Sequence, residues 1–179
     1  MRTCIIVNRI SVLLSILLFM FTACHSLRKT SESNVSVKQK EADYKNFSEK
    51  LGFKVDNNCN IKLIKESVSW LGVPYKFGGS SRTGIDCSGL VCNIYIAVYG
   101  KKVPRTAGEL FEQSTKIKED KLQEGDLVFF NYDGKKASHV GIFLKETYFV
   151  HASTKKGVMI GDLNDPYNKK YFLKGGRIP

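Results

Sequence analysis

The sequence has few of the residues that build metal sites or disulfide frameworks. Its 179 residues include five cysteines, none of them in a CxxC spacing, and three histidines. These counts argue against a structural zinc module, and the chain is long enough to bury a core without disulfides. It has no internal repeat and no low-complexity run. With 42% hydrophobic and 25% charged residues, the composition is typical of one compact domain rather than of a disordered or fibrous chain.

Acidic side chains are absent from residues 1–23, where the only charged side chains are those of Arg2 and Arg9. An apolar run over 10–21, interrupted only by two serines, follows this basic start. The order predicts a secretory signal over 1–23. The alternative is a plain signal anchor, although the run is shorter than the ~18 residues of a spanning helix. Removal of this segment, with its two arginines, would lower the formal charge from +11 to +9.

Cys24 follows the apolar run, directly after Phe21, Thr22 and Ala23. These four residues resemble a bacterial lipobox, whose cysteine becomes N-terminal after cleavage and is acylated on its sulfur and its amine. The resemblance implies lipidation of Cys24 and attachment to a membrane through it.

Residues 24–58 are rich in Ser, Lys, Glu and Asn and contain only isolated apolar residues. This composition predicts a tether. Near its end, the spacing of Tyr44, Phe47 and Leu51 predicts a short helix. A single globular domain is expected over 59–179.

Helices are expected in the first half of this domain. Apolar residues recur at helical spacing over 61–71. A second helix is predicted over 86–100, because Asp86 is a good N-cap and Gly100 a good terminator. A third, short helix is expected over 106–113. The glycine-rich loop over 74–84 is expected to be held by two aromatic residues, Tyr75 and Phe77.

Strands are expected in the second half, where short apolar runs alternate with turn residues after Gly125. The runs cover residues 127–130, 140–144, 148–150 and 158–160. Helices first and an antiparallel sheet afterwards predict an α+β layer fold rather than a doubly wound one.

Cys87 is the strongest candidate nucleophile, because it lies in the first turn of the predicted second helix. The backbone N–H groups and the positive end of the helix dipole at this place favour a thiolate. The alternative is a small buried hydrophobic residue, which is the commonest role of a cysteine. Cys4, Cys59 and Cys92 are expected to be buried or incidental, and Cys4 would be removed with the signal.

Two of the histidines are candidates for the base. His139 opens one predicted strand and His151 closes the next; a hairpin centred near residue 145 would make them approximate cross-strand partners. One imidazole could then accept the proton of Cys87 while the other orients it, as in a nucleophile, base and orienter triad. One alternative is that each is only a capped histidine at a strand end. The other is a zinc site of Cys87, His139 and His151, for which the spacing gives no diagnostic sign.

Six segments occur in an order that resembles the NlpC-type peptidoglycan peptidases, which are papain-like cysteine enzymes. The segments are Gly72-Val73-Pro74-Tyr75-Lys76-Phe77-Gly78-Gly79, Asp86-Cys87-Ser88-Gly89-Leu90-Val91, Pro104-Arg105-Thr106-Ala107, Gly125-Asp126-Leu127-Val128-Phe129-Phe130, Ser138-His139-Val140-Gly141-Ile142 and His151-Ala152-Ser153. One departure is Phe77, where the family usually has tryptophan.

The resemblance implies a papain-like fold with the nucleophile at a helix N-terminus packed on the sheet. It implies Cys87 as nucleophile, His139 as general base and His151 as the orienting residue. It also implies that Tyr75 helps the Cys87 backbone N–H to bind the developing oxyanion. Three further residues are expected to line the site: Asp86, Ser88 and Ser138. Asp86 could instead be only an N-cap, and Ser88 only a first-turn residue.

The function that follows is hydrolysis of an amide bond in peptidoglycan stem peptides, either between D-glutamate and the diamino acid or in the cross-link. No metal or cofactor is expected, nor nucleic acid, for which the chain has no groove-reading motif. The expected protein is a monomer, lipid-anchored in the bacterial cell envelope, where a basic surface suits an anionic polymer or membrane. The alternatives are a papain-like acyltransferase or amidase acting on a lipid or small molecule, and a non-catalytic wall-binding lipoprotein.

Overall fold

The computed structural model describes residues 37–134 and 136–179. The predicted signal over 1–23, the lipidation at Cys24 and the first part of the tether lie outside the described residues. The chain divides into two compact units, Met1–Asn46 and Phe47–Pro179. In the first unit residues 37–46 are helical, and in the second the helical segment over 47–51 opens the unit. No helix in the described part is long and apolar enough to cross a membrane.

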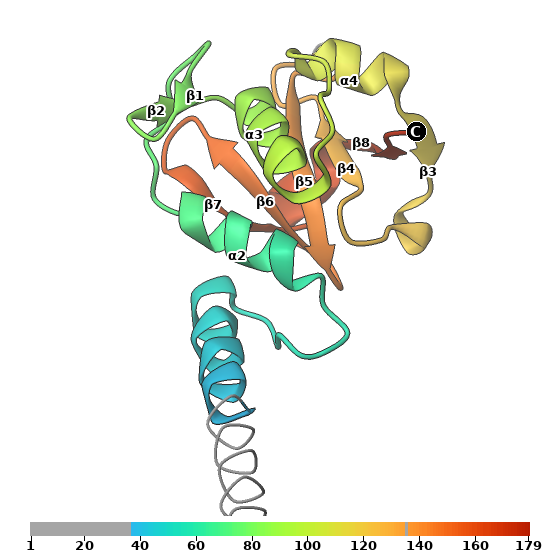
Figure 1. Ribbon diagram of the computed structural model, residues 1–179. Coiled ribbons are helices and arrows are strands. Elements are labelled where there is room, and N and C mark those ends of the chain that lie inside the picture. Colours follow the sequence, from blue (N-terminus) through green and yellow to red (C-terminus); the bar gives the residue numbers. More distant parts are fainter. Residues whose placement is uncertain (1–36, 135) are drawn as a thin grey trace, which may run out of the picture. The chain divides into compact units, whose positions relative to one another are not determined.

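The second unit carries the remaining helices and strands (Figure 1). Their order is α2 (Ile61–Trp70), β1 (Ser80–Ser81), β2 (Gly84–Ile85), α3 (Cys87–Tyr99), α4 (Ala107–Gln113), β3 (Thr115–Ile117), η1 (Glu119–Lys121), β4 (Leu127–Phe130), β5 (His139–Lys145), β6 (Tyr148–Ser153), β7 (Gly157–Asp162), α5 (Pro166–Tyr171) and β8 (Phe172–Arg177).

The larger sheet has six strands in the order β3-β8-β4-β5-β6-β7, and every neighbouring pair is antiparallel. Helix α3 packs on β5 and β6, and α2 packs on α3, so these two helices form a layer against the sheet (Figure 1). All four residues of β4 are buried, as expected for a strand covered on both faces. The predicted α+β layer fold is confirmed.

Local sequence signals explain the helix boundaries. The Asn60 side chain accepts a hydrogen bond from the Leu63 N–H at the start of α2. Gly100 ends α3 in the left-handed conformation, with φ of 64°, which glycine adopts without strain. Thr106 and Glu109 form a reciprocal capping box at the start of α4. These three helices agree with the predicted ones.

The folded unit extends further towards the N-terminus than the predicted boundary at residue 59. Leu51, Phe53 and Val55 are buried. The Phe53 ring stacks on that of Tyr148, with 5.2 Å between centroids. Apolar burial therefore begins inside the segment that was expected to be a tether.

The loop over 74–84 also differs from the prediction. It contains the short strands β1 and β2, which pair with each other, and Tyr75 forms a bridge with Ile85. Phe77, in contrast, is 89% exposed, so it does not hold the loop. Hydrogen bonds within the loop hold it instead, together with one from the Gly78 N–H to Asp86 and one from Arg105 to the Gly79 carbonyl oxygen.

Candidate active site

Cys87 is the first residue of α3, and its position follows from the cap that precedes it. The Asp86 side chain accepts a hydrogen bond from the Gly89 N–H at 2.6 Å, which starts the helix directly at the cysteine. Cys87 is 7% exposed. Because α3 packs on β5, the Val140 backbone N–H hydrogen-bonds to the Cys87 thiol. The sulfur thus lies beside the strand that begins with His139.

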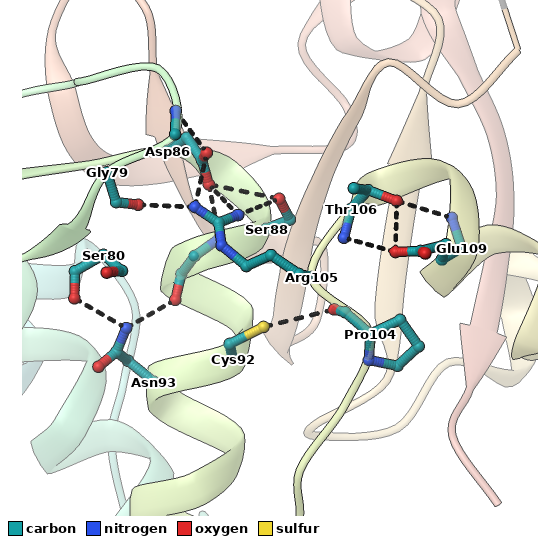
Figure 2. A network of polar contacts seen from close by, with 12 residues as sticks. Gly79, Ser80, Asp86, Ser88, Cys92, Asn93, Pro104, Arg105, Thr106 and Glu109 are labelled. Carbon is teal, nitrogen blue, oxygen red and sulfur yellow. Dashed lines mark hydrogen bonds and ion pairs between the residues drawn. The ribbon is translucent and has the colours of Figure 1, made fainter.

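Arg105 holds the start of α3 against the neighbouring loop (Figure 2). Its guanidinium donates to both carboxylate oxygens of Asp86, at 2.8 and 2.9 Å, and to the Gly79 carbonyl oxygen at 2.9 Å. Asp86 also accepts from the Gly78 N–H at 2.9 Å. Burial opposes ionisation of Asp86, but Arg105 and these backbone N–H groups more than offset it and lower the pKa of its carboxyl.

Ser88 belongs to the same network. Its hydroxyl donates to Asp86 at 3.3 Å and accepts from Arg105 at 2.9 Å. The side chains of Asp86 and Ser88, predicted to line the site, do so with their polar atoms engaged inside the protein. No role for Arg105 was predicted from the sequence, where its only signal was its place in the segment Pro104-Arg105-Thr106-Ala107.

His139 and His151 lie side by side. The distance from His139 Nε2 to His151 Nδ1 is 2.8 Å, and both residues are buried. They are not direct cross-strand partners, however. Ile142 pairs with Val150, and the β5–β6 register shifts between Phe143 and Lys145. The hairpin is centred about one residue after the predicted position, so the two imidazoles meet diagonally, and the prediction that they lie side by side is confirmed.

Gly141 makes the diagonal contact possible. A Cβ atom added there would lie 2.7 Å from the Phe149 ring, 2.9 Å from the Val150 carbonyl oxygen and 3.3 Å from the His151 Cβ. The missing side chain therefore leaves the space in which His151 packs beside β5.

The electrostatics of the site favour neutral forms of all three groups. Burial and the neighbouring His151 lower the pKa of His139 to about 3. Burial lowers the pKa of His151 to about 4. Burial raises the pKa of the Cys87 thiol above its usual 9.0, and it outweighs the hydrogen bond from Val140. The expectation of a resting thiolate is therefore corrected: desolvation of the sulfur wins over the helix N-terminus.

Two cavities flank these groups and share Tyr75 and Ser138 as lining residues. The cysteine-side cavity, of about 480 Å³, is lined by Cys87 together with Phe77 and Arg105. The histidine-side cavity, of about 650 Å³, is lined by His139 and His151 together with residues of β6, β7 and α5. Cys87 therefore lines one cavity and the histidine pair lines the other, and Tyr75 and Ser138 belong to the lining of both.

Tyr75 and Ser138 lie where the two cavities meet. Burial, Cys87 and Asp86 raise the pKa of the Tyr75 phenol, so it keeps its proton and can donate a hydrogen bond. The Ser138 hydroxyl oxygen is buried, and within the described residues it has no hydrogen-bond partner. The Tyr75 hydroxyl can thus donate to a bound molecule, whereas the Ser138 hydroxyl oxygen is covered by protein.

The remaining cysteines lie elsewhere. Cys92 is half-buried on α3, and its thiol lies 3.3 Å from the Pro104 carbonyl oxygen. Cys59 is buried. Across residues 37–134 and 136–179, no group of three or more His, Cys, Asp or Glu side chains is placed to hold a metal ion.

The part of the chain that carries the candidate site is similar to known proteins. Residues 72–177 match the NlpC/P60 family. This chain belongs to the NlpC/P60 family. The resemblance seen in the six sequence segments is thereby confirmed.

Three similar proteins illustrate the relationship. The chain is 38% identical over 123 residues to murein DD-endopeptidase MepS/murein LD-carboxypeptidase of Escherichia coli K12, which covers 68% of this chain and 65% of that protein. It is 41% identical over 111 residues to the probable endopeptidase NlpC of the same organism, covering 62% and 72%. A solved Staphylococcus aureus structure, described as similar to lipoprotein and of the NLP/P60 family, has a TM-score of 0.59 and 30% identity, covering 71% of this chain and 46% of that one. The match thus spans slightly less than two thirds of MepS.

Proposed function

We propose that this protein is a cysteine peptidase that hydrolyses amide bonds in peptidoglycan stem peptides. One observation carries the proposal: a thiol at the first turn of α3 lies beside a strand whose first residue, His139, is hydrogen-bonded to a second histidine. This is the arrangement of a nucleophile, a base and a group that orients the base. The names of the relatives, murein DD-endopeptidase among them, support the class of substrate.

The chemistry follows from the hydrogen bond between the histidines. When His139 donates its Nε2–H to His151 Nδ1, the lone pair of His139 lies on Nδ1 and can accept the Cys87 proton. The sulfur then attacks the carbonyl carbon, and the Cys87 N–H and the Tyr75 hydroxyl stabilise the oxyanion. His139 returns the proton to the leaving amine as the C–N bond breaks. Water attacks the resulting thioester, and its proton passes through His139 back to the sulfur.

Neutral resting groups have a mechanistic consequence. Since burial raises the pKa of Cys87 and lowers that of His139, no ion pair forms in advance. Proton transfer from the Cys87 sulfur to His139 therefore accompanies the attack on the carbonyl carbon. This transfer requires a bound substrate.

Digestion of purified sacculi tests the proposal. The wild type is expected to release soluble muropeptides, and Cys87→Ala is expected to lower the rate by a factor on the order of 10³ or more. Cys92→Ala is the matched control, because it makes the same change in the same helix at a residue that lines neither cavity. Release by Cys87→Ala at the wild-type rate would exclude the mechanism.

Other outcomes separate the alternatives. Binding to sacculi without release of muropeptides by the wild type would indicate a wall-binding protein. An acyl group on Cys87 that derives from a lipid or small molecule, detected by mass spectrometry, would indicate an acyltransferase or amidase.

For the location, we propose the bacterial cell envelope, with the protein anchored in a membrane through lipid on Cys24. The basic start, the apolar run and the lipobox-like residues before Cys24 support this proposal. Radiolabelled palmitate is expected to enter the wild type and not Cys24→Ser. Equal labelling of both would refute anchoring at this cysteine.

A further inference from the structure

The aromatic rings beside the proposed base have no part in the reaction described above. His139 lies next to the rings of Tyr132 and Phe130, with 5.2 and 6.2 Å between ring centroids. Tyr132 comes two residues after the end of β4, and it lines the histidine-side cavity together with His139. Tyr132 is therefore the nearer of the two rings and shares a cavity wall with the base.

One hydrogen bond does not fix the imidazole of His139. Its Nε2 atom lies 2.8 Å from Nδ1 of His151, and the ring could still rotate about the line that joins these two atoms. Such a rotation would turn Nδ1 of His139 away from the Cys87 thiol, whose proton it must accept. A second contact has to restrain the plane of the ring, and the Tyr132 ring, inclined at 46° to the imidazole, is placed to make it.

The Tyr132 ring is itself firmly held. It stacks on the ring of Phe130, with 5.0 Å between centroids and 9° between the planes, and on that of Tyr167, at 5.2 Å and 19°. Phe130 is fully buried in the core. A ring that is packed in this way cannot swing aside without losing these contacts, so it gives the imidazole a rigid neighbour.

The hydroxyl of Tyr132 ties the ring to α5. It donates to Asn168 Oδ1 at 2.7 Å, and Asn168 Nδ2 donates at 2.8 Å to the carbonyl oxygen of Asp162, the last residue of β7. Burial, together with Tyr167 and Asp165, raises the pKa of the Tyr132 phenol, so the hydroxyl keeps its proton and remains the donor. Two successive hydrogen bonds therefore join α5 and β7 to the ring beside the base.

We infer that Tyr132 is a positioning residue for His139: its ring covers and orients the imidazole, and Asn168 holds that ring in place. Neither Tyr132 nor Asn168 takes part in a bond that forms or breaks. The inference rests on the proposed peptidase function, in which His139 accepts the Cys87 proton, and adds the residues that keep this base in line.

The burial of His139 makes the effect of the ring measurable. Burial, followed by the neighbouring His151, lowers the pKa of His139 to about 3. Removal of the Tyr132 ring would admit water to the imidazole and raise this pKa towards its usual value of 6.5. A higher pKa by itself would make His139 a stronger base and speed up proton transfer. A loss of rate would therefore report lost orientation.

Other titratable side chains also surround His139. Cys87 faces it from α3, and the histidine-side cavity is further lined by Tyr75, Asp133, His151, Lys155, Lys156, Asp165 and Tyr167. All of these remain in the variants proposed below, so a change in the titration of His139 can be assigned to Tyr132 and its anchor.

Tyr132→Ala tests the role of the ring, with hydrolysis of a soluble muropeptide as the assay. The substitution is expected to lower kcat about tenfold or more, because small misplacements of a base lower rates steeply. KM is expected to stay within about threefold, since the loss falls on the chemical step. The acid limb of kcat/KM, which reports the titration of His139 in the free enzyme, is expected to move to higher pH.

Tyr148→Ala is the matched control. Tyr148 is also half-buried and stacks on another ring, that of Phe53 at 5.2 Å between centroids, but it lines neither cavity. The control is expected to leave kcat within about twofold and the acid limb in place.

A double-mutant cycle tests the anchor. Tyr132→Phe keeps the ring and loses the hydrogen bond to Asn168, and Asn168→Ala removes the same bond from the other side. Each is expected to lower kcat about threefold, and the double variant is expected to lose no more than Asn168→Ala alone. This cycle decides the matter if Tyr132→Ala does not fold.

Three results would each overturn the inference. They are wild-type kcat with an unmoved acid limb in Tyr132→Ala, the same losses in Tyr148→Ala, and losses that multiply in Tyr132→Phe/Asn168→Ala.

NMR titration of the His139 imidazole separates this inference from the proposed function, because it needs no substrate. His139 is expected to titrate at higher pH in Tyr132→Ala than in the wild type. This shift without cleavage by the wild type would refute the peptidase proposal and keep the cover that Tyr132 gives to His139. Cleavage by the wild type with an unchanged titration in the variant would do the reverse, and the absence of both would refute both.

Discussion

Gly141 lies at the centre of the histidine contact, so Gly141→Ala is the sharpest test of the site geometry. The new methyl group would lie 2.7 Å from the Phe149 ring and 2.9 Å from the Val150 carbonyl oxygen. Phe149 is fully buried, and a backbone carbonyl in a paired strand cannot easily move. Overpacking of this kind costs about 1–3 kcal/mol.

The same methyl group would also press on His151, whose Cβ lies 3.3 Å from the position of the added atom. To relieve the overlap with the new methyl group, β6 would have to shift by a few tenths of an ångström. This shift would disturb the 2.8 Å contact between the histidines. Small misplacements of a catalytic group lower rates steeply, so kcat is expected to fall about tenfold or more. Urea denaturation measures the loss of unfolding free energy, and peptide hydrolysis at saturating substrate measures kcat.

Two other glycines serve as controls. At Gly175 on β8 an added Cβ would lie 2.6 Å from the Leu122 side chain and 3.0 Å from a backbone oxygen, away from both cavities. Gly175→Ala is therefore expected to lower stability similarly but to leave kcat within about twofold. At Gly108 no atom lies within 4 Å, and alanine in this helix should be neutral or stabilising by up to about 1 kcal/mol. Wild-type stability and wild-type kcat in Gly141→Ala would refute the reasoning.

Further predictions follow from the pKa shifts and the Arg105 contact. Because the pKa values of His139 and His151 are lowered to about 3 and about 4, the unfolded chain takes up protons below pH ~6.5 that the native protein does not. Stability should be complete above that pH and fall by about 1.4 kcal/mol per pH unit for each histidine on acidification towards pH 4. Urea titrations at several pH values measure how the unfolding free energy changes with pH. The same pH dependence after replacement of both histidines by glutamine would contradict this prediction. Arg105→Met leaves the buried Asp86 carboxylate without its two guanidinium bonds and should cost about 2 kcal/mol of unfolding free energy; a loss below about 0.5 kcal/mol would contradict this. Because the pKa of Cys87 lies above 9.0, its alkylation by iodoacetamide should rise about tenfold per pH unit from pH 7 to 9, and a plateau below pH 8 would indicate a resting thiolate.

Elements with strong local signals were predicted from the sequence. The caps at Asn60, Asp86 and Thr106 satisfy backbone N–H groups within three residues, so the information lies next to the helix that it starts. The apolar run of β4 was found at its full length, Leu127–Phe130. Patterns of this kind depend only on neighbours along the chain.

Elements that depend on distant partners were missed. The strand β8 (Phe172–Arg177) contains Gly175, Gly176 and charged residues, and its sequence does not alternate clearly. It forms because it lies between β3 and β4, where Arg177 donates to both carboxylate oxygens of Asp126 at 2.7 Å. Strand formation at such a place depends on tertiary context rather than on intrinsic preference.

The candidate site shows the same division. The sequence by itself determined which residues bring chemistry to the site: a cysteine at a helix start and two histidines on neighbouring strands. Only the tertiary structure decided their diagonal meeting beside Gly141, since a single register shift between Phe143 and Lys145 sets it. The protonation states of Cys87, His139 and His151 could likewise not be predicted from the sequence. They depend on pKa values that burial shifts, and the packing of α3 on the sheet produces this burial.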